Sequence, residues 1–361
     1  MLYHLFVPLA DEYTFFNLFR YITFRSAYAT VTALVLSFVL GPWVIRKLRA
    51  LKAGQMIRAE GPQSHQRKAG TPTMGGVLIL AAVVVPTLLW ADLTDRFIQI
   101  VLVATLWMGG LGFLDDWLKV VKRRSRGLIA IQKIVGQVLF SVLLGAWLYL
   151  DPIHGDYVTM TSVPFFKERF VDFGWFYIPF IIVVVTAATN AVNLTDGLDG
   201  LAIGLSGIAA AAFAAFAYVI GRSDWSQYLQ ILYLPGAGEL TIYCLALMGA
   251  ALGFLWFNAH PAQVFMGDTG SLALGGAFGT LAILLKIEFV LVLVGGVFVL
   301  EALSVIIQVV SFKLRGERVF KMSPLHHHFE LSGWAEETIV LRFYILGIMF
   351  AMLAASTLKL R

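Results

Sequence analysis

The sequence predicts an all-α integral membrane protein that forms one polytopic domain over residues 1–361 and has about ten transmembrane helices. Two observations support this class. Of the 361 residues, 59% are hydrophobic and only 14% are charged, whereas a soluble domain carries about 25% charged residues. The mean hydropathy is +0.81, and the apolar residues gather in runs of roughly 20, the length that a spanning helix needs.

Ten apolar runs are long enough to be spans, at 24–47, 73–91, 97–114, 128–150, 173–192, 198–220, 239–257, 270–286, 288–311 and 338–358. Residues 1–22 contain several charged residues and no basic start with a clean apolar core, so we expect no cleavable signal peptide. We expect a short interfacial helix there, with Phe15, Phe16 and Phe19 on its apolar side. The single cysteine, Cys244, falls within a predicted span, which excludes an intrachain disulfide. Two loops, 151–172 and 221–238, are long enough for a hairpin or a short helix.

The distribution of lysine and arginine predicts the orientation in the membrane. Ten spans place these five stretches on one side: 46–72, 115–127, 193–197, 258–269 and 312–337. They hold sixteen Lys and Arg residues, and the opposite side holds nine. We therefore expect the first side to be cytoplasmic and both termini to be periplasmic. This bias explains most of the net charge of +5, so no nucleic-acid partner is needed.

Three polar segments interrupt the apolar sequence: GFLDDW at 112–117, NAVNLTDGLDG at 190–200 and FMGDTGS at 265–271. Each places carboxylates where an apolar run meets a predicted loop, and all three fall on the cytoplasmic side. A carboxylate at the centre of a spanning helix costs about 2.5–3.5 kcal/mol on insertion scales. Hard oxygen ligands suit Mg²⁺. The three segments therefore predict a site for a divalent cation and a polyphosphate.

Asp115 and Asp116 are adjacent, and neighbours on a helix diverge by about 100°. They cannot both face one atom, so the pair predicts two different roles, such as acceptor activation and metal or fold support. A plainer interpretation is two solvated carboxylates ahead of the basic loop.

Asn190, Asn193, Asp196 and Asp199 recur at steps of three. This spacing places them near one face if the chain stays helical or tightens to a 3₁₀ helix. Capping and turn formation by Asn and Asp could explain two of the four, so we predict a functional role for the set.

Asp268 lies at a glycine-rich helix start, which is a ready anion site. A carboxylate there would repel phosphate unless a cation lay between them, so Asp268 is predicted to bind a metal. Capping of the helix by Asp268 or Thr269 is the alternative. In the same segment, Phe265 either packs in the loop or supports a planar ring.

The last two polar groups lie in the C-terminal third. Glu301, Ser304, Gln308 and Ser311 share one face of a predicted span, where they brace the site or line its floor. His326, His327 and His328 cannot all reach one metal ion from consecutive positions. We interpret them as histidines that face a phosphate; an ordinary surface loop is the alternative.

These segments, in this order, resemble the polyprenyl-phosphate N-acetylhexosamine-1-phosphate transferase superfamily. The resemblance covers essentially the whole chain and rests on these motifs: GTPTMGG at 70–76 with Lys68 before it, LDD at 114–116, NAVNLTDGLDGLA at 190–202, FNAHPAQVFMGDTGSLALGG at 257–276 and PLHHHFE at 324–330. The last motif and the ten spans favour the branch with a muramoyl-pentapeptide donor over the branch with an N-acetylglucosamine donor.

The resemblance implies transfer of phospho-MurNAc-pentapeptide from its UDP carrier to undecaprenyl phosphate, with Mg²⁺ as cofactor, in the bacterial inner membrane. It implies Asp268 as the Mg²⁺ ligand, with Asp115 or Asp116 as a further ligand or as the group that activates the acceptor. Direct attack by the lipid phosphate and a covalent aspartyl intermediate both remain open, and we prefer direct attack. A homodimer is also expected from the family. For substrate binding or catalysis, the resemblance implies Lys68, Asn193, Asp196, Asp199, Asn258, Phe265, His327 and His328. The sequence patterns add Lys133, Asn190, Gln308 and His326.

Two other classes compete with the transferase. A cation-coupled transporter also uses intramembrane carboxylates, but here they gather at one face and no inverted repeat is evident. A sensor or scaffold explains the spans and leaves the spaced Asn and Asp residues unexplained.

Overall fold

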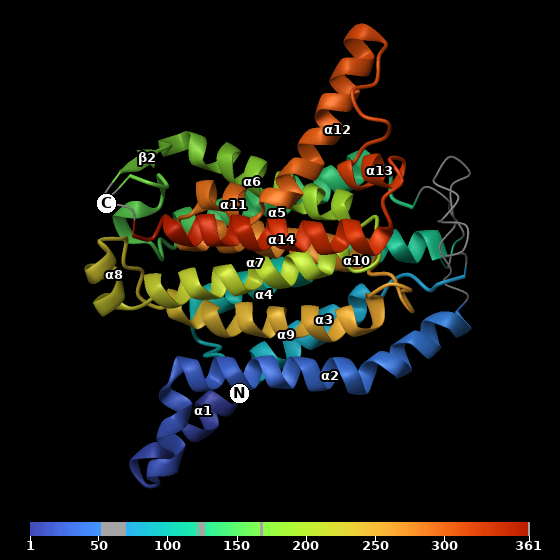
Figure 1. Cartoon of the computed structure of the whole chain (residues 1–361). Coiled ribbons are helices and arrows are strands. Elements are labelled where there is room, and N and C mark those ends of the chain that lie inside the picture. Colours follow the sequence, from blue (N-terminus) through green and yellow to red (C-terminus); the bar gives the residue numbers. More distant parts are fainter. Residues whose placement is uncertain (52–69, 121, 123–126, 167–168, 360–361) are drawn as a thin grey trace.

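The computed structural model describes residues 1–51, 70–120, 122, 127–166 and 169–359. Within this part the chain forms a helical bundle with a small antiparallel sheet at one end (Figure 1). Its α-helices are α1 (Leu2–Phe6), α2 (Ile22–Ala50), α3 (Gly76–Trp90), α4 (Arg96–Val120), α5 (Ala130–Leu150), α6 (Tyr177–Thr195), α7 (Leu201–Ile220), α8 (Ser223–Leu229), α9 (Leu240–Asn258), α10 (Gly267–Leu285), α11 (Glu288–Val294), α12 (Gly296–Arg315), α13 (Leu325–Glu330) and α14 (Glu336–Ser356). The strands are β1 (Met160–Ser162) and β2 (Phe170–Asp172), and short 3₁₀ helices cover Pro8–Asp11, Thr14–Arg20, Gly155–Tyr157, Gly174–Phe176 and Ala237–Glu239.

Nine of the helices in the described ranges are long and apolar enough to cross a membrane: α2, α4, α5, α6, α7, α9, α10, α12 and α14. The predicted all-α membrane class is thus confirmed. The predicted span 73–91 corresponds to α3, which has 15 residues and is shorter than the other nine.

Two predicted boundaries are wrong. The span at 288–311 is divided into α11 and α12, with Gly295 between them in a non-helical conformation. The whole region is apolar, so hydropathy gave no sign of the break. The predicted loop 115–127 starts too early, because α4 stays helical to Val120. The two adjacent aspartates therefore lie on a helix.

Helix α10 lies at the centre of the bundle, against α3, α4, α6 and α7. Every residue from Thr269 to Leu285 is buried. Small side chains in the sequence SLALGGAFGTLA allow the neighbouring backbones to approach closely. The body of α10 is therefore enclosed by protein, while its first two residues, Gly267 and Asp268, remain partly exposed.

The end of the molecule that carries the sheet is built around the junction of α10 and α11. The β1–β2 hairpin and α8 occupy the loops where a hairpin or short helix was expected. Lys286, only 1% exposed, donates to the carbonyl of Val158 at 2.6 Å and to the Tyr177 hydroxyl at 2.8 Å. Its own carbonyl accepts hydrogen bonds from the N–H and the hydroxyl of Ser162. The hairpin thus satisfies the backbone where the helix is interrupted.

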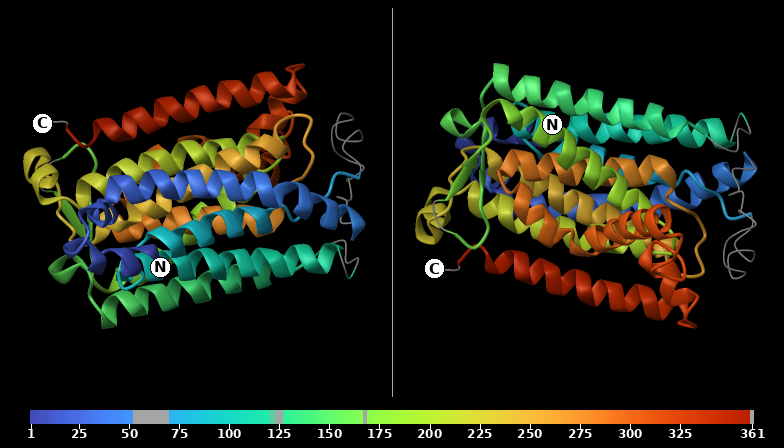
Figure 2. Two further views of the ribbon diagram at one scale, coloured as in Figure 1. Left: turned by 90° about the horizontal axis from the view of Figure 1, so that it is seen from below. Right: turned by 90° about the horizontal axis from the view of Figure 1, so that it is seen from above.

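The N-terminal segment forms short helices rather than the single interfacial helix we expected. Phe16 stacks on Phe6, and Phe19 stacks on Trp90, with ring centroids 4.9 Å and 5.9 Å apart. Phe15 is 69% exposed. The N-terminus and the C-terminal end of α14 lie in the half of the molecule opposite α13 (Figures 1 and 2).

Candidate active site

The three predicted acidic segments meet at the end of the bundle where α4 finishes and α10 begins. Asp115, Asp116 and Asp268 each place one carboxylate oxygen within 4.8 Å of the others. Asp115 and Asp116 are 0% and 2% exposed. The structure therefore brings together carboxylates that are about 150 residues apart in the sequence.

Asp116 caps helix α10 from the neighbouring helix. Its carboxylate accepts hydrogen bonds from the Asp268 N–H at 3.2 Å, the Thr269 N–H at 2.9 Å and the Thr269 hydroxyl at 2.6 Å. Gly112, one turn earlier on α4, makes this contact possible, because a Cβ atom there would lie 2.1 Å from the Asp268 carbonyl oxygen. Both oxygens of Asp116 thus serve the start of α10, where backbone N–H groups lack partners within the helix.

Asp115 faces two lysines. One of its oxygens accepts a hydrogen bond from the Leu128 N–H at 2.6 Å. The other lies 2.5 Å from the Lys119 ammonium and 3.0 Å from that of Lys133. This oxygen therefore sits in a cationic environment.

Asp268 shares both lysines with Asp115. Lys119 lies 3.2 Å from its carboxylate, and Lys133 donates a short hydrogen bond to the same oxygen. The other oxygen accepts from the Asn193 amide at 3.0 Å, and this amide also donates to the Ser271 hydroxyl at 2.8 Å. Two carboxylates and two ammonium groups thus form one compact group.

The four residues that recur at steps of three between 190 and 199 make different contacts. Asn190 donates to the Gln137 side chain at 2.9 Å and to the Thr186 carbonyl at 2.8 Å, so it links α6 to α5. Asn193 faces Asp268. Helix α6 ends at Thr195, and Asp196 lies just beyond it.

Asp196 lies close enough to the other carboxylates for their negative charge to affect its pKa. Burial, and then the carboxylates of Asp268, Asp116 and Asp199, raise the pKa of Asp196 to about 8. A cation or a cationic group near this carboxylate would favour its ionised form.

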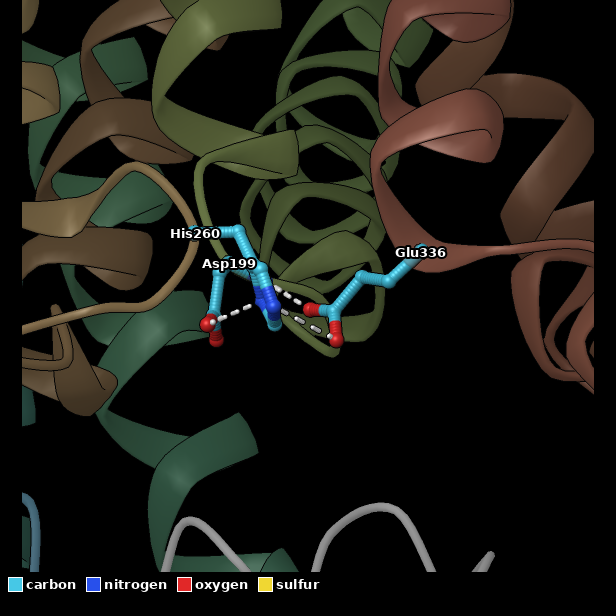
Figure 3. A group of neighbouring side chains, drawn as sticks. All are labelled: Asp199, His260 and Glu336. Atoms are coloured by element: carbon cyan, nitrogen blue, oxygen red, sulfur yellow. Dashed lines mark hydrogen bonds and ion pairs between the residues drawn. The ribbon is translucent and has the colours of Figure 1, made fainter.

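A second group of titratable side chains lies beside the 196–200 turn: Asp199, His260 and Glu336 (Figure 3). His260 Nδ1 donates to Asp199 Oδ2 at 3.1 Å. The same nitrogen lies 3.5 Å from a carboxylate oxygen of Glu336. The loop after α9, the turn before α7 and the first turn of α14 thus meet at one imidazole.

Two other predicted residues of the α9–α10 segment hold its backbone. Asn258, 4% exposed, accepts from the Gly200 N–H at 3.1 Å and donates to the Val264 carbonyl at 2.8 Å. Phe265 is partly buried. Its N–H and carbonyl pair with the Pro72 carbonyl and the Gly75 N–H, each at 2.8 Å.

The three histidines lie on the short helix α13 and have different surroundings. His326 is 0% exposed and lies 3.3 Å from Glu301 of α12, which is also buried. A Cβ atom at Gly197 would lie 2.2 Å from His326 Nε2, so a glycine there is needed for this packing. His327 Nδ1 contacts Glu330 at 2.7 Å, and His328 Nδ1 accepts from the Lys321 N–H at 3.2 Å.

Gln308 forms its hydrogen bonds with a loop rather than with the carboxylates of the site. Gln308 accepts from the N–H groups of Val319 and Phe320 at 3.1 Å and 2.9 Å, and donates to the Phe320 carbonyl at 3.1 Å. It thus organises the loop between α12 and α13. Lys68 lies outside the described residues.

Three residues of the site were not predicted as site residues from the sequence. Lys119 follows Asp115 by four positions, the spacing of a helical ion pair, and this signal was available. His260 falls within the motif at 257–276, but its partners come from distant segments. Glu336 gave no usable signal, because it reads as an ordinary acidic residue in the first turn of a helix.

Comparison with known proteins identifies the family. The model of glycosyl transferase family 4 matches residues 98–286, and signature 1 of phospho-N-acetylmuramoyl-pentapeptide-transferase matches residues 68–80. Proteins of that name from Geobacter sp. (strain M21) and Citrifermentans bemidjiense are each 56% identical to the chain over the full length of both proteins. The protein of that name from Koribacter versatilis is 52% identical and covers 98% of the chain. The chain belongs to the phospho-N-acetylmuramoyl-pentapeptide-transferase family.

The part of the family signature that the structure describes packs directly on the site. The Gly75 and Gly76 N–H groups donate to the carbonyls of Phe265 and Met266, both at 2.8 Å. These bonds hold the turn before α3 against the segment that leads into α10. In this member of the transferase family, the signature therefore supports the backbone next to Asp268.

Proposed function

We propose that the chain transfers phospho-MurNAc-pentapeptide from UDP-MurNAc-pentapeptide to undecaprenyl phosphate, forming lipid I and releasing UMP, at the cytoplasmic face of the bacterial inner membrane. The observation that carries the proposal is the group of Asp115, Asp268, Lys119 and Lys133. It combines oxygen ligands for a cation with ammonium groups for phosphates, in a chain of the transferase family.

The carboxylates fit Mg²⁺ as the cofactor. The donors are all oxygen atoms, which Mg²⁺ prefers, and Asp115 and Asp268 already hold two cationic groups against their oxygens. We assign Asp268 as the main ligand and Asp115 as its neighbour, because both oxygens of Asp116 cap α10. When bound, Mg²⁺ would neutralise charge on the diphosphate and on the departing UMP.

The polar side chains then divide between the two substrates. When the substrates bind, Lys119 and Lys133 exchange their contacts with the carboxylates for contacts with phosphate oxygens. Asn193, Asp196, Asp199, Asn258 and Phe265 lie around the turns that would receive the uridine and its phosphates. His327 and His328, on α13, are assigned to the sugar phosphate.

We propose direct attack as the chemical step. An oxygen of the undecaprenyl phosphate attacks the phosphorus that carries the sugar, and the bond from that phosphorus to the UMP oxygen breaks. Asp115 keeps the acceptor phosphate ionised. The alternative covalent route predicts that the enzyme releases one equivalent of UMP from the donor alone and keeps a phosphorylated aspartate.

The test uses purified protein in detergent with undecaprenyl phosphate, Mg²⁺ and one donor at a time. We expect UMP release and a lipid-linked product with UDP-MurNAc-pentapeptide. UDP-GlcNAc serves as the competing donor. Turnover with UDP-GlcNAc alone would overturn the proposed substrate, and the lack of UMP with either donor would overturn the proposed reaction. We also propose a homodimer, which the mass of the detergent complex tests.

A further inference from the structure

One imidazole, that of His260, joins three carboxylates from separate segments. Nδ1 lies 3.1 Å from Asp199 and 3.5 Å from Glu336, while Nε2 lies 3.3 Å from Glu337. Asp199 is 3% exposed, and the side chains of Glu336 and Glu337 are 9% and 61% exposed. The two nitrogens therefore face different environments, one buried and one open to solvent.

The buried contacts fix the turn that carries Asp199. The Asp199 N–H donates to Glu336 at 2.7 Å, and the Ala262 N–H donates to the same Asp199 oxygen that His260 contacts, at 3.1 Å. The next residue, Gly200, has a φ of +81°, and its carbonyl accepts from the Tyr344 hydroxyl at 2.7 Å. The backbone and the carboxylate of Asp199 are thus both fixed, and His260 is the side-chain donor to that carboxylate.

We propose that His260 is a positioning residue: through Nδ1 it sets the direction of the Asp199 carboxylate, and thereby the affinity of the site for the nucleoside of the donor. The inference rests on the proposed function, because it takes Asp199 as part of the nucleotide site. A hydrogen bond that orients a carboxylate inside a buried network is worth more than an exposed ion pair. The Nδ1 contact is therefore the important one, and the Nε2 contact with exposed Glu337 contributes little.

The two nitrogens can be separated by substitution. An asparagine at 260 places an amide N–H near the position of Nδ1, and a glutamine places one near the position of Nε2. We expect His260→Asn to keep the donor KM and the UMP inhibition constant near the wild-type values. We expect His260→Gln and His260→Ala to raise both by about tenfold, the effect of losing one hydrogen bond to a charged group.

Matched measurements make the effect specific. Glu337→Gln removes the exposed contact and should change the donor KM by less than about twofold. In all variants kcat and the KM for undecaprenyl phosphate should change little, because His260 acts on nucleoside binding. Melting temperatures in detergent show whether each variant is folded.

Several results would overturn the inference. Equal effects of His260→Asn and His260→Gln on the donor KM would show that the Nδ1 contact has no special role. A fall in kcat with an unchanged donor KM would show that His260 acts on a step other than nucleoside binding. Stoichiometric zinc in purified wild-type protein, lost in His260→Ala, would make this group a metal site instead. Wild-type turnover separates the two proposals: if the wild type releases UMP from the donor, the proposed function stands whatever the His260 variants do.

Discussion

At the scale of single residues, adjacent aspartates have different surroundings because of the geometry of a helix. Asp116 points at the start of α10 and accepts three hydrogen bonds there. Asp115 makes no cap and instead faces Lys119 and Lys133, the two lysines that it shares with Asp268. The sequence predicted two roles from this adjacency, but could not assign them, because the partners of Asp116 are about 150 residues further along the chain.

Replacing each aspartate by asparagine should therefore give two different defects. Asp116→Asn removes the charge and one acceptor from the cap of α10, so we expect a loss of about 1–2 kcal/mol of stability and a lower melting temperature. Asp115→Asn should melt like the wild type and lose turnover. Identical melting temperatures for the two variants, with activity lost only in Asp116→Asn, would reverse the assignment.

Asp268→Asn tests the proposed cation site without relying on turnover alone. We expect this variant to be inactive and to fold. A ligand that binds only the folded state raises the melting temperature, so Mg²⁺ and Mn²⁺ should stabilise the wild type and leave Asp268→Asn unchanged. Near-normal turnover of the variant at saturating Mg²⁺ would contradict the site.

At the scale of elements, the hairpin and the α10–α11 junction depend on buried polar groups. His154 precedes the hairpin, and its Nε2–H donates to the Leu284 carbonyl at 2.8 Å. Burial and the nearby Lys286 lower the pKa of His154 to about 3. The imidazole is therefore neutral in the folded protein at physiological pH, while the unfolded chain has a His pKa of about 6.5.

This difference predicts the direction of a pH effect. Between pH 6.5 and 3 the unfolded state binds a proton that the folded state does not, so stability falls as the pH falls, by at most about 1.4 kcal/mol per pH unit. The melting temperature of the wild type should drop from pH 7 to pH 5. His154→Gln keeps an N–H donor without a titratable ring, so its drop should be smaller. Parallel curves for the two proteins would show that His154 does not control the effect.

At the scale of the whole molecule, composition and charge placement were enough to predict the class, and local hydropathy predicted most of the helices. The break at Gly295 was missed because both sides of it are apolar. The contact of His326 with Glu301 and the contact of His260 with Glu336 were missed because each joins two distant segments, and no local pattern encodes such a pair. The sequence predicted that the carboxylates gather at one face of the bundle. Their hydrogen-bond and ion-pair partners could be identified only from the structure.

The orientation of the whole chain is open to a simple labelling test. Cys244, the only cysteine, is fully buried, so the wild type should not react with a membrane-impermeant maleimide. Ser223→Cys, at the exposed start of α8, should react in intact spheroplasts. Arg318→Cys, in the exposed loop between α12 and α13, should react only after the membrane is opened. The opposite pattern would invert the predicted topology.

The central position of α10 has a consequence for how the protein is made. This helix is the least apolar of the nine spans, and 94% of its membrane-length window is buried. Of the helices that pack against it, α3, α4, α6 and α7 precede it in the chain and the short helix α11 follows it. The four helices that enclose most of α10 are therefore synthesised before the helix that they enclose. Asp268 lies at the start of this helix, so we expect the proposed cation site to form when the helix packs into the bundle.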